Sequence, residues 1–428
     1  LHYPLRRQRQ MCIRDRYDDS ASVAAVAIGS QVMQTITGII LGITTGTTVL
    51  IAIATGAKDN RKVAFTIGSS VWLFSITGVV LTLVMVLFHS RIAELMHTPV
   101  EAMVDTKNYI LVCSLGILFI VGYNVVCGIL RGLGDSKTPL YFVGLACVIN
   151  IVLDFILVGY FHWGATGAAI ATVTAQGVSF GIALWFLYRH GFHFDFSRKD
   201  IRLNRNLSKK ILVLGAPIAL QDALINVSFL IITVIVNQMG VIASASLGVV
   251  EKIIVFAMLP PMAISSAVAT MTAQNYGAGL IKRMNKCLAS GIGIALVFGV
   301  SVCVYSQFLP ETLTAFFTKD AAVVAMAADY LRGYSIDCIV VSFVFCINSY
   351  FSGQGNSLFP MIHSLIATFL FRIPLSYWFS QIDSSSLFIM GFAPPISTVV
   401  SLLICIWYLR YTQRKLYLRG TMMPAMSN

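Results

Sequence analysis

The sequence predicts an all-α membrane protein built from two pseudo-symmetric six-helix bundles, and three observations predict it. Hydrophobic residues make up 57% of the 428 residues and charged residues only 11%, with a mean hydropathy of +0.81. Soluble domains carry about 25% charged residues. Apolar runs of membrane-spanning length recur along the chain. A sequence pattern also recurs at an offset of 221 residues, which indicates a duplicated architecture.

Each apolar run predicts one transmembrane helix, because only helices and closed barrels satisfy backbone polar groups in lipid and these runs exceed a barrel strand. In chain order the eleven runs cover residues 20–54, 63–88, 108–130, 139–160, 165–188, 211–238, 243–275, 287–309, 331–351, 359–379 and 387–409. The nine cysteines are scattered singly without a CxxC pair, and so predict neither a zinc site nor a disulfide framework.

The basic residues fall between the apolar runs and alternate between two sides of the membrane. This placement explains the net charge of +12 without a nucleic-acid partner. One side has nineteen Lys and Arg: Lys58, Arg61, Lys62, Arg131, Lys137, Arg189, Arg198, Lys199, Arg202, Arg205, Lys209, Lys210, Lys282, Arg283, Lys286, Arg410, Arg414, Lys415 and Arg419. The other side has four: Arg91, Lys107, Lys319 and Arg332. The positive-inside rule makes the first side cytoplasmic, and so we expect a multi-pass protein of the cell (inner) membrane with a cytoplasmic C-terminus.

The repeat divides the chain into two lobes. The stretch "RGLGDSKTP" (131–139) recurs as "SGQGNSLFP" (352–360), and "GAKDNRK" (56–62) recurs as "GAGLIKR" (277–283). We therefore predict the following organisation: an N-terminal lobe of five helices at 18–190, a basic cytoplasmic loop at 191–210, a C-terminal lobe of six helices at 211–412 and a cytoplasmic tail at 413–428.

One helix is missing from this count. The helix expected at 211–238 opens the second lobe, and its partner in the first lobe would end near residue 19, where no apolar segment occurs. The arginine-rich segment 1–17 contains "MCIRDR", which is similar to a translated sequencing-adapter fragment. We expect residues 1–17 to be non-native and a first helix to be absent from the chain.

Several motifs now identify a family. They are "AAVAIGSQ" and "GITTGTTVLIAIATGAKDNRKV" within 24–63, "GILRGLGDSKTPLYFVGLACVINIVLDFILVG" (128–159), "GATGAAIAT" (164–172) and "LPPMAISSAVATMTAQNYGAG" (259–279). In these motifs the chain resembles the multidrug and toxic compound extrusion (MATE) family of efflux transporters over about 400 residues. The resemblance implies twelve helices in two lobes around a central cavity, alternating access, and efflux driven by H⁺ or Na⁺.

The resemblance also sets what we expect the chain to bind. The predicted substrate is a small organic compound, either a cation or an amphipathic drug, carried across the lipid bilayer by a monomer. We expect no cofactor other than the coupling ion. The chain has no HExxH, GxSxG or P-loop motif, and so is expected not to be an enzyme.

The stretch "CVINIVLDFILVGY" (147–160) places two polar residues inside a predicted span. Asn150 and Asp154 are spaced i, i+4 and share one helix face, at roughly 16 and 22 Å along the helix from Pro139. Thr172 lies on the next helix, roughly 10 Å below its outer end. A carboxylate, an amide and a hydroxyl at similar depth could bind a hard cation or hold a proton. The resemblance implies that the same three residues belong to a first-lobe cation site, which an aspartate on the first helix would complete.

These residues also have structural interpretations. Asp154 could extend toward the outer interface or cap a neighbouring helix, and Asn150 could serve helix packing. Thr172 could do the same, since small and hydroxylated residues favour close helix contacts in membranes. We favour the functional interpretation of Asp154 because intramembrane acids usually face a cavity. If Na⁺ is the coupling ion, Asp154 and Asn150 are its predicted ligands.

The second lobe carries a possible substrate-binding or polar site with three candidate residues, Glu251, Gln221 and Arg372. Glu251 could attract cationic substrates or titrate, and equally it could form a salt bridge with Arg372. In the family resemblance, members with a second-lobe sodium site have acids on the seventh and tenth helices. The matching positions here are Gln221 and Val341, and so we expect no such sodium site.

Two other functions remain as alternatives. A lipid-linked oligosaccharide flippase shares the superfamily architecture, although more helices and a more basic cavity would be expected. The "GLGD" at 132–135 is similar to the GxGD signature of intramembrane aspartyl proteases, but its repeat copy is "GQGN", without the acid. We interpret "GLGD" as a turn between helices.

Overall fold

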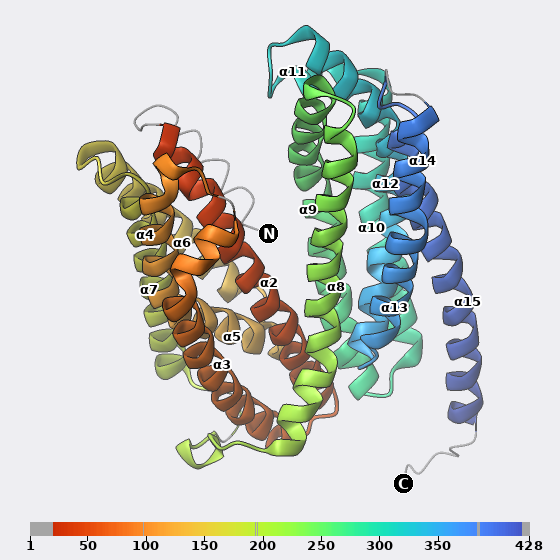
Figure 1. Cartoon of the computed structure of the whole chain (residues 1–428). Helices are drawn as coiled ribbons and strands as arrows, with labels where there is room; N and C mark the ends of the chain where they lie inside the picture. Colours follow the sequence, from red (N-terminus) through yellow and green to blue (C-terminus); the bar gives the residue numbers. More distant parts are fainter. Residues whose placement is uncertain (1–19, 97, 193, 195, 383–385, 422–428) are drawn as a thin grey trace. The chain divides into compact units, whose positions relative to one another are not determined.

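The computed structural model describes residues 20–421 except 97, 193, 195 and 383–385. Every regular element among these residues is a helix (Figure 1), which confirms the all-α prediction. Ten described helices are long and apolar enough to cross a membrane, and one bent pair raises the number to as many as eleven. The chain is therefore a multi-pass membrane protein. The segment 1–17 that was predicted to be non-native lies outside the described residues, as does 422–428.

The described residues form two compact units. Unit 1 contains the residues up to Ala223 together with Ala273–Gly279, and unit 2 contains Leu224–Thr272 and the residues from Leu280 onward. The lobe boundary predicted at 210 differs from this division, because the first half of α8 (Arg205–Asn237) packs against α2 (Ser20–Gly56) within unit 1. Gly46 approaches the Ile211 carbonyl so closely that a Cβ would overlap it.

Unit 1 is built mainly from the helices that precede the basic loop. They are α2 (Ser20–Gly56), α3 (Asn60–Leu95), η1 (Val100–Ala102), α4 (Met103–Leu115), α5 (Ile117–Leu133), α6 (Lys137–Asp154), η2 (Phe155–Tyr160), α7 (Gly164–His190) and η3 (Arg198–Asp200). A buried core that includes Met33, Ile67, Phe74 and Tyr109 joins α2, α3 and α4. The segment predicted as a basic loop at 191–210 contains η3 and the beginning of α8.

The span predicted at 108–130 is not one straight helix. The structure has two helices there, α4 and α5, which meet at Gly116 with a bend of 48°. The apolar run is continuous across the bend, and so hydropathy gives no sign of it. At Gly116 the side chain of Val173 occupies the space that a Cβ would need. A residue with a side chain at 116 would therefore push α7 away.

Unit 2 contains the remaining helices. They are most of α9 (Val241–Gly277), the second half of α8 (Arg205–Asn237), α10 (Ile281–Phe308), α11 (Pro310–Ala315), α12 (Ala321–Gly353), α13 (Leu358–Ile366), η4 (Ala367–Arg372), α14 (Ile373–Ile382), η5 (Met390–Phe392) and α15 (Ala393–Thr421). Helix α12 is the most buried of the membrane-spanning helices. It packs against α10 and α15 and carries Tyr330 and Tyr334 into the core.

The repeat is visible in the backbone. Gly134 ends α5 with a φ of 98°, and Gly355, 221 positions later, has a φ of 86° after α12. Such positive φ values favour glycine. In both copies the side chain of the next residue caps the helix that begins two positions later, α6 at Lys137 and α13 at Leu358. Asp135 Oδ1 accepts a hydrogen bond from the backbone N–H of Thr138 at 3.0 Å, and Asn356 Oδ1 accepts one from Phe359 at 3.4 Å. The "GLGD" motif is therefore a turn, as predicted, and its Asp135 also caps α6.

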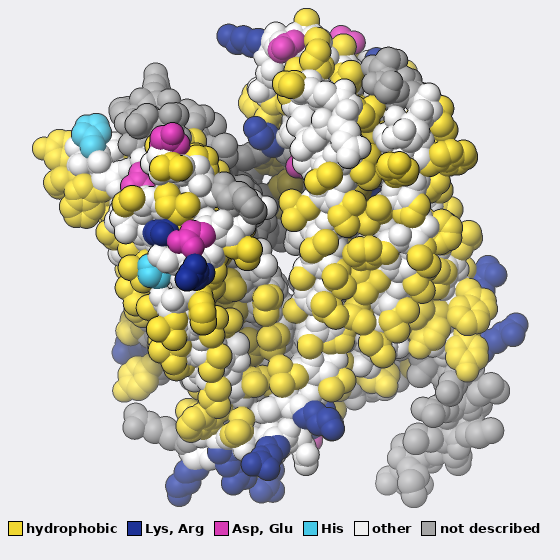
Figure 2. Space-filling view, viewed as in Figure 1, with side chains coloured by type: hydrophobic (Ala, Val, Ile, Leu, Met, Phe, Trp, Pro, Cys, Tyr) yellow, Lys and Arg dark blue, Asp and Glu magenta, His cyan; other side chains and the backbone are white. Residues whose placement is uncertain are grey.

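The outer faces of the helices suit a hydrocarbon environment. On α3 the side chains of Val80, Leu83 and Leu87 are 52%, 56% and 72% exposed. Figure 2 shows hydrophobic side chains along the sides of the helices, whereas Lys and Arg gather at the end of unit 1 where α3 begins. We call this the basic end of unit 1, and its exposed residues include Lys58, Arg61, Lys62 and Arg202.

Candidate functional site

Asp154 is the last residue of α6 and lies on the buried face of that helix. It is 2% exposed and Asn150, one turn earlier, is fully buried, whereas Val148 and Val152 are 58% and 50% exposed. The apolar side chains thus form the outer face of α6, and the two polar side chains face the interior of unit 1. Asp154 is therefore placed away from the outer face, contrary to the interpretation that it extends into the interface.

Directly after Asp154 the helix widens into a π-helical turn, η2 (Phe155–Tyr160). The backbone N–H of Phe161 donates to the carbonyl of Ile156 at 3.0 Å, an i to i+5 hydrogen bond. Single π-helical turns inside α-helices occur frequently at functional sites. Here the turn redirects the chain immediately beyond the buried carboxyl, before α7 returns.

Thr172, predicted to lie at the depth of Asp154, lies next to Asn150, one turn before that acid. The side-chain amide of Asn150 donates to the Thr172 hydroxyl at 3.5 Å, between the neighbouring helices α6 and α7. The three first-lobe candidates, Asn150, Asp154 and Thr172, are therefore gathered in one part of unit 1. Their oxygen atoms are of the kinds that bind hard cations. Their role in cation binding stays a prediction.

Two of the three second-lobe candidates lie together in unit 2. Glu251 on α9 has a side-chain hydrogen bond with Thr233 and interacts electrostatically with Arg372. Arg372 is the last residue of η4, and its guanidinium carbon lies 4.4 Å from the centre of the Phe229 ring. Gln221 belongs to unit 1. Arg372 thus exerts an electrostatic influence on Glu251, and a salt bridge between the two stays a prediction.

Asp337 is a buried acid that the sequence reasoning missed. It lies on α12, is 4% exposed, and shares side-chain hydrogen bonds with Tyr334 and Thr398. It also interacts electrostatically with Arg372. The signal was present, because Asp337 lies inside the apolar run 331–351 just as Asp154 lies inside its own run. An acid within a span is a functional candidate by the same argument.

A second polar group within unit 2 was also missed. His363 is 1% exposed, and its Nδ1 and Nε2 atoms lie 2.8 Å from the Ser401 hydroxyl and 2.7 Å from Asn348 Oδ1. The Cys405 sulfur lies 3.4 Å from Nε2. These contacts satisfy a buried imidazole through three neighbouring helical segments. Among the described residues, no group of three or more His, Cys, Asp or Glu could hold a metal ion.

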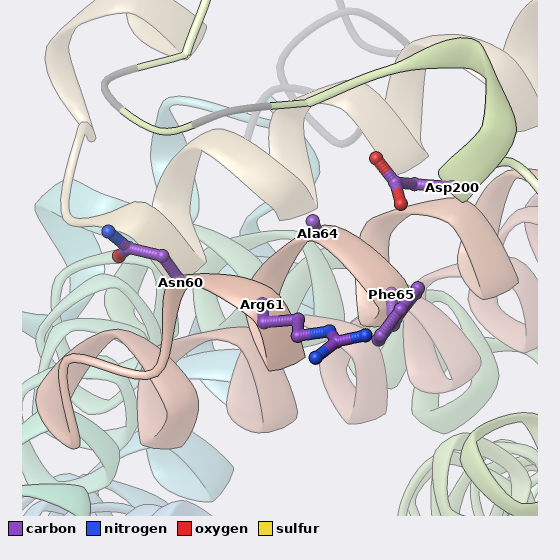
Figure 3. Close-up of a pocket in the computed structure, with 5 residues that line it drawn as sticks. All are labelled: Asn60, Arg61, Ala64, Phe65 and Asp200. Atoms are coloured by element: carbon purple, nitrogen blue, oxygen red, sulfur yellow. The ribbon is translucent and has the colours of Figure 1, made fainter.

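A surface pocket of about 360 Å³ lies at the basic end of unit 1. It is lined by Asn60, Arg61, Ala64 and Phe65 of α3 and by Asp200 of η3 (Figure 3). Arg61 and Arg202 both contact the Phe65 ring, at 5.7 and 5.1 Å from its centre. Its lining includes none of the buried polar residues described above.

This architecture agrees with the family that the sequence matches. The sequence pattern of the MatE family matches residues 11–156 and 217–378. The chain belongs to the MatE family. Membership confirms the resemblance seen in the sequence. The match begins inside the segment 1–17 that was predicted to be non-native.

Named relatives of this MatE chain are bacterial drug-resistance proteins. The probable multidrug resistance protein YpnP of Bacillus subtilis is 29% identical over 84% of this chain and 80% of its own length. The probable multidrug resistance protein NorM of Thermotoga maritima is 26% identical over 83% and 77%. The multidrug export protein MepA of Staphylococcus aureus is 26% identical over 79% and 75%.

Solved structures show that the MatE chain has the fold of its family. An outward-facing multidrug resistance MATE family transporter of the MOP superfamily matches with a TM-score of 0.90, covering 97% of this chain and 92% of that one at 22% identity. A MOP superfamily transporter from Pyrococcus furiosus, described as having a binding pocket of reverse polarity, matches with a TM-score of 0.89 at 22% identity over the same shares.

Proposed function

We propose that this chain exports organic compounds, cationic or amphipathic, by alternating access and that a cation, H⁺ or Na⁺, drives the export. Family membership and the names of the relatives support drug export. The observation that supports cation coupling is the buried carboxyl of Asp154, which shares a helix face with Asn150 beside Thr172.

The chemistry follows from burial. A carboxylate inside a membrane protein is costly unless a cation or a proton neutralises it. Asp154 supplies the negative charge, and the oxygens of Asn150 and Thr172 supply neutral ligands or hydrogen-bond partners. Coupling then requires only that the cation and the substrate stabilise different conformations, because a ligand shifts an equilibrium by its difference in affinity between the two states.

The distribution of Lys and Arg supports an orientation with the basic ends of the helices and the C-terminus in the cytoplasm of a bacterial-type inner membrane. In this orientation Asp154 lies in the outer half of its helix. A cation entering from outside would therefore reach it before crossing the membrane.

The test is efflux of ethidium from cells that express the protein, with and without a protonophore. We expect the Asp154→Asn variant to lose efflux entirely, because an amide cannot take up a proton or balance a cation. The measurements are the rate of loss of ethidium fluorescence and the amount of protein in the membrane.

The matched control is Glu101→Gln, which neutralises an exposed acid in η1. This control should export ethidium at the unaltered rate. Undiminished efflux by Asp154→Asn, at equal protein level, would overturn the proposal. If expression of the unaltered protein never changes ethidium accumulation, the oligosaccharide flippase becomes the better hypothesis.

A further inference from the structure

The pocket at the basic end of unit 1 plays no part in the proposed function. Its volume of about 360 Å³ falls within the range of small-molecule sites, about 300–1,000 Å³. Its lining carries both signs of charge, from Arg61 of α3 and Asp200 of η3. In Figure 3 the Asp200 carboxylate projects from η3 on one side of the pocket, and the Arg61 guanidinium extends beside Phe65 on the other. The pocket therefore offers separate places for an anionic and a cationic group.

The fold holds η3 against α3 and so builds the pocket. Gly68 approaches the Asp200 carbonyl so closely that a Cβ would overlap it. The indole N–H of Trp72 donates a hydrogen bond to the Ile201 carbonyl at 3.0 Å. Within the connecting segment, the backbone N–H of Ser197 donates to Asp200 Oδ2 at 2.8 Å. The carbonyl of Asp200, its side chain and the next residue are thus all fixed by contacts.

Two arginines supply positive charge beside the pocket. The guanidinium carbons of Arg61 and Arg202 lie 5.7 and 5.1 Å from the centre of the Phe65 ring. Both side chains are exposed, and the ion pairs formed among the described residues involve neither of them. The planar guanidinium group matches the geometry of a phosphate, to which it donates two parallel hydrogen bonds. Two such groups on one ring favour a ligand that contains a phosphate.

The pocket lies at the depth of lipid headgroups. Helix α3 has 36 residues and so is about 54 Å long, whereas the hydrocarbon core of a bilayer is about 30 Å thick. The charged residues of α3 lie near its two ends, with none between Lys62 and Arg91. The hydrocarbon therefore surrounds the middle of α3. The first turns of the helix, which carry Asn60, Arg61 and Phe65, lie among the headgroups.

Apolar side chains continue from the pocket toward the interior of the membrane. Ile201, next to Asp200, is exposed, and so are Trp72 and Ile76 on α3. Trp72 is hydrogen-bonded to Ile201, and its i, i+4 spacing puts Ile76 on the same helix face. Indole rings are common at the boundary between headgroups and hydrocarbon. A ligand with a polar head in the pocket would thus meet apolar surface on the membrane side.

We propose that this pocket binds the headgroup of phosphatidylethanolamine, with the phosphate at Arg61 and Arg202 and the ammonium at Asp200. Phosphatidylglycerol has the phosphate without an ammonium, and so it would leave the Asp200 carboxylate facing a like charge. The quaternary ammonium of phosphatidylcholine has no N–H to donate to that carboxylate. The mixed charge of the lining thus selects one headgroup among common phospholipids. The proposal does not depend on what the protein transports.

The test titrates the purified full chain with single phospholipids of identical acyl chains and counts bound lipid by native mass spectrometry. We expect phosphatidylethanolamine to bind about two- to fivefold more tightly than phosphatidylglycerol, the effect of one exposed ion pair. Phosphatidylcholine should bind more weakly than phosphatidylethanolamine. Equal affinities for the three lipids in the unaltered protein would overturn the proposal, and this measurement requires no variant.

Two variants separate the two ends of the headgroup. Arg61→Gln should weaken the binding of both phosphatidylethanolamine and phosphatidylglycerol, because both contain the phosphate. Asp200→Asn should weaken phosphatidylethanolamine alone and strengthen phosphatidylglycerol, so that the preference disappears. The asparagine carbonyl oxygen can still accept the hydrogen bond from the Ser197 N–H, and size-exclusion chromatography verifies folding. A full preference for phosphatidylethanolamine in folded Asp200→Asn would contradict the assigned ammonium position.

The matched control is Lys62→Gln, which removes the same charge from the next residue of α3. Lys62 is exposed and does not line the pocket, and so its variant should bind both lipids as the unaltered protein does. An equal loss in Lys62→Gln and Arg61→Gln would show that the basic end attracts lipid phosphates without a site, and would overturn the proposal.

A last arm distinguishes a lipid from a free phosphorylated amine. Glycerophosphoethanolamine has the same headgroup and no acyl chains, and so it cannot contact the apolar surface at Ile201 and Trp72. Added at the concentration that saturates the protein with phosphatidylethanolamine, it should displace none of the bound lipid. Displacement at that concentration would assign the pocket to a soluble ligand and overturn the lipid assignment.

Discussion

At the scale of single residues, burial separates Asp154 from the other acids of unit 1. It is 2% exposed and lies on the inner face of α6, whereas Asp59 and Asp135 cap helices at the basic end. Depth along the helix could be predicted from sequence because the rise per residue is constant. The same arithmetic put Thr172 near the depth of Asp154, and the structure shows it one helical turn away, in contact with Asn150.

The Thr172 hydroxyl offers a graded test of the first-unit group. In Thr172→Val the side-chain amide of Asn150 loses its acceptor at 3.5 Å. Loss of a buried hydrogen-bond partner costs about 1–2 kcal/mol, which corresponds to about a five- to thirtyfold change in an equilibrium constant. We expect the cation concentration that gives half-maximal ethidium efflux in proteoliposomes to rise by that factor.

Thr172→Ser is the matched control, because it keeps the hydroxyl and removes only a methyl group. Serine should restore the cation dependence of the unaltered protein. Equal cation dependence in the valine and serine variants would show that the hydroxyl takes no part in the site.

Asp337 marks the limit of sequence reasoning at this scale. In the family resemblance, the positions of the second-lobe acids match Gln221 and Val341. The sequence reasoning considered those two positions and so missed Asp337, which lies one helical turn before Val341. Which acids converge depends on the rotation of α9, α12 and η4 about their own axes. Neither hydropathy nor spacing along one helix fixes that rotation between helices.

At the scale of helices, hydropathy located the membrane spans but gave no sign of the bend between α4 and α5. The apolar run is uninterrupted across Gly116, yet α4 and α5 differ in direction by 48°. A membrane span is recognised by the low polarity of its side chains. A bend between two apolar helices does not change that polarity, and so it cannot be seen in the hydropathy of the sequence. Turns were more predictable. Gly134 and Asp135 carry backbone requirements, a positive φ and a helix cap, that only a few residue types meet.

The contact between the end of α2 and the end of α9 depends on two glycines within unit 1. A Cβ on Gly56 would overlap the Gln274 carbonyl, and a Cβ on Gly277 would overlap the Ile53 carbonyl. Gly56 and Gly277 are 221 positions apart, as are Ile53 and Gln274, and so the two contacts are equivalent under the repeat. We expect Gly56→Ala to destabilise the protein by about 1–3 kcal/mol, because the backbones must separate.

The control lies on the same helix. Gly38 has open space where a Cβ would be, and so Gly38→Ala should leave the midpoint of thermal unfolding in detergent unchanged or slightly raised. Gly277→Ala should behave like Gly56→Ala. Equal midpoints for Gly38→Ala and Gly56→Ala would contradict the close contact.

At the scale of the whole molecule, the prediction that remains open is orientation. Lys282 is the second residue of α10, at the end that follows α9, and Lys319 lies between α11 and α12. The charge distribution assigns Lys282 to the cytoplasm and Lys319 to the exterior. In intact cells a membrane-impermeant thiol reagent should label Lys319→Cys at once. It should label Lys282→Cys only after permeabilisation.

The unaltered chain is the background for this experiment. Its eight described cysteines are buried or half-buried, and so little labelling of them is expected. Labelling of Lys282→Cys in intact cells, without labelling of Lys319→Cys, would reverse the topology and place the C-terminus outside.

The duplicated turn has one more consequence. One connection occurs twice in the chain, once between α5 and α6 and once between α12 and α13. The two copies can therefore be compared residue by residue within a single sequence. Gly134 and Gly355 match, as do Pro139 and Pro360, whereas Leu133 corresponds to Gln354 and Lys137 corresponds to Leu358. The residues that are identical in both copies are those that the backbone of the connection requires. The positions that differ are those where the residue could change after duplication without altering the connection.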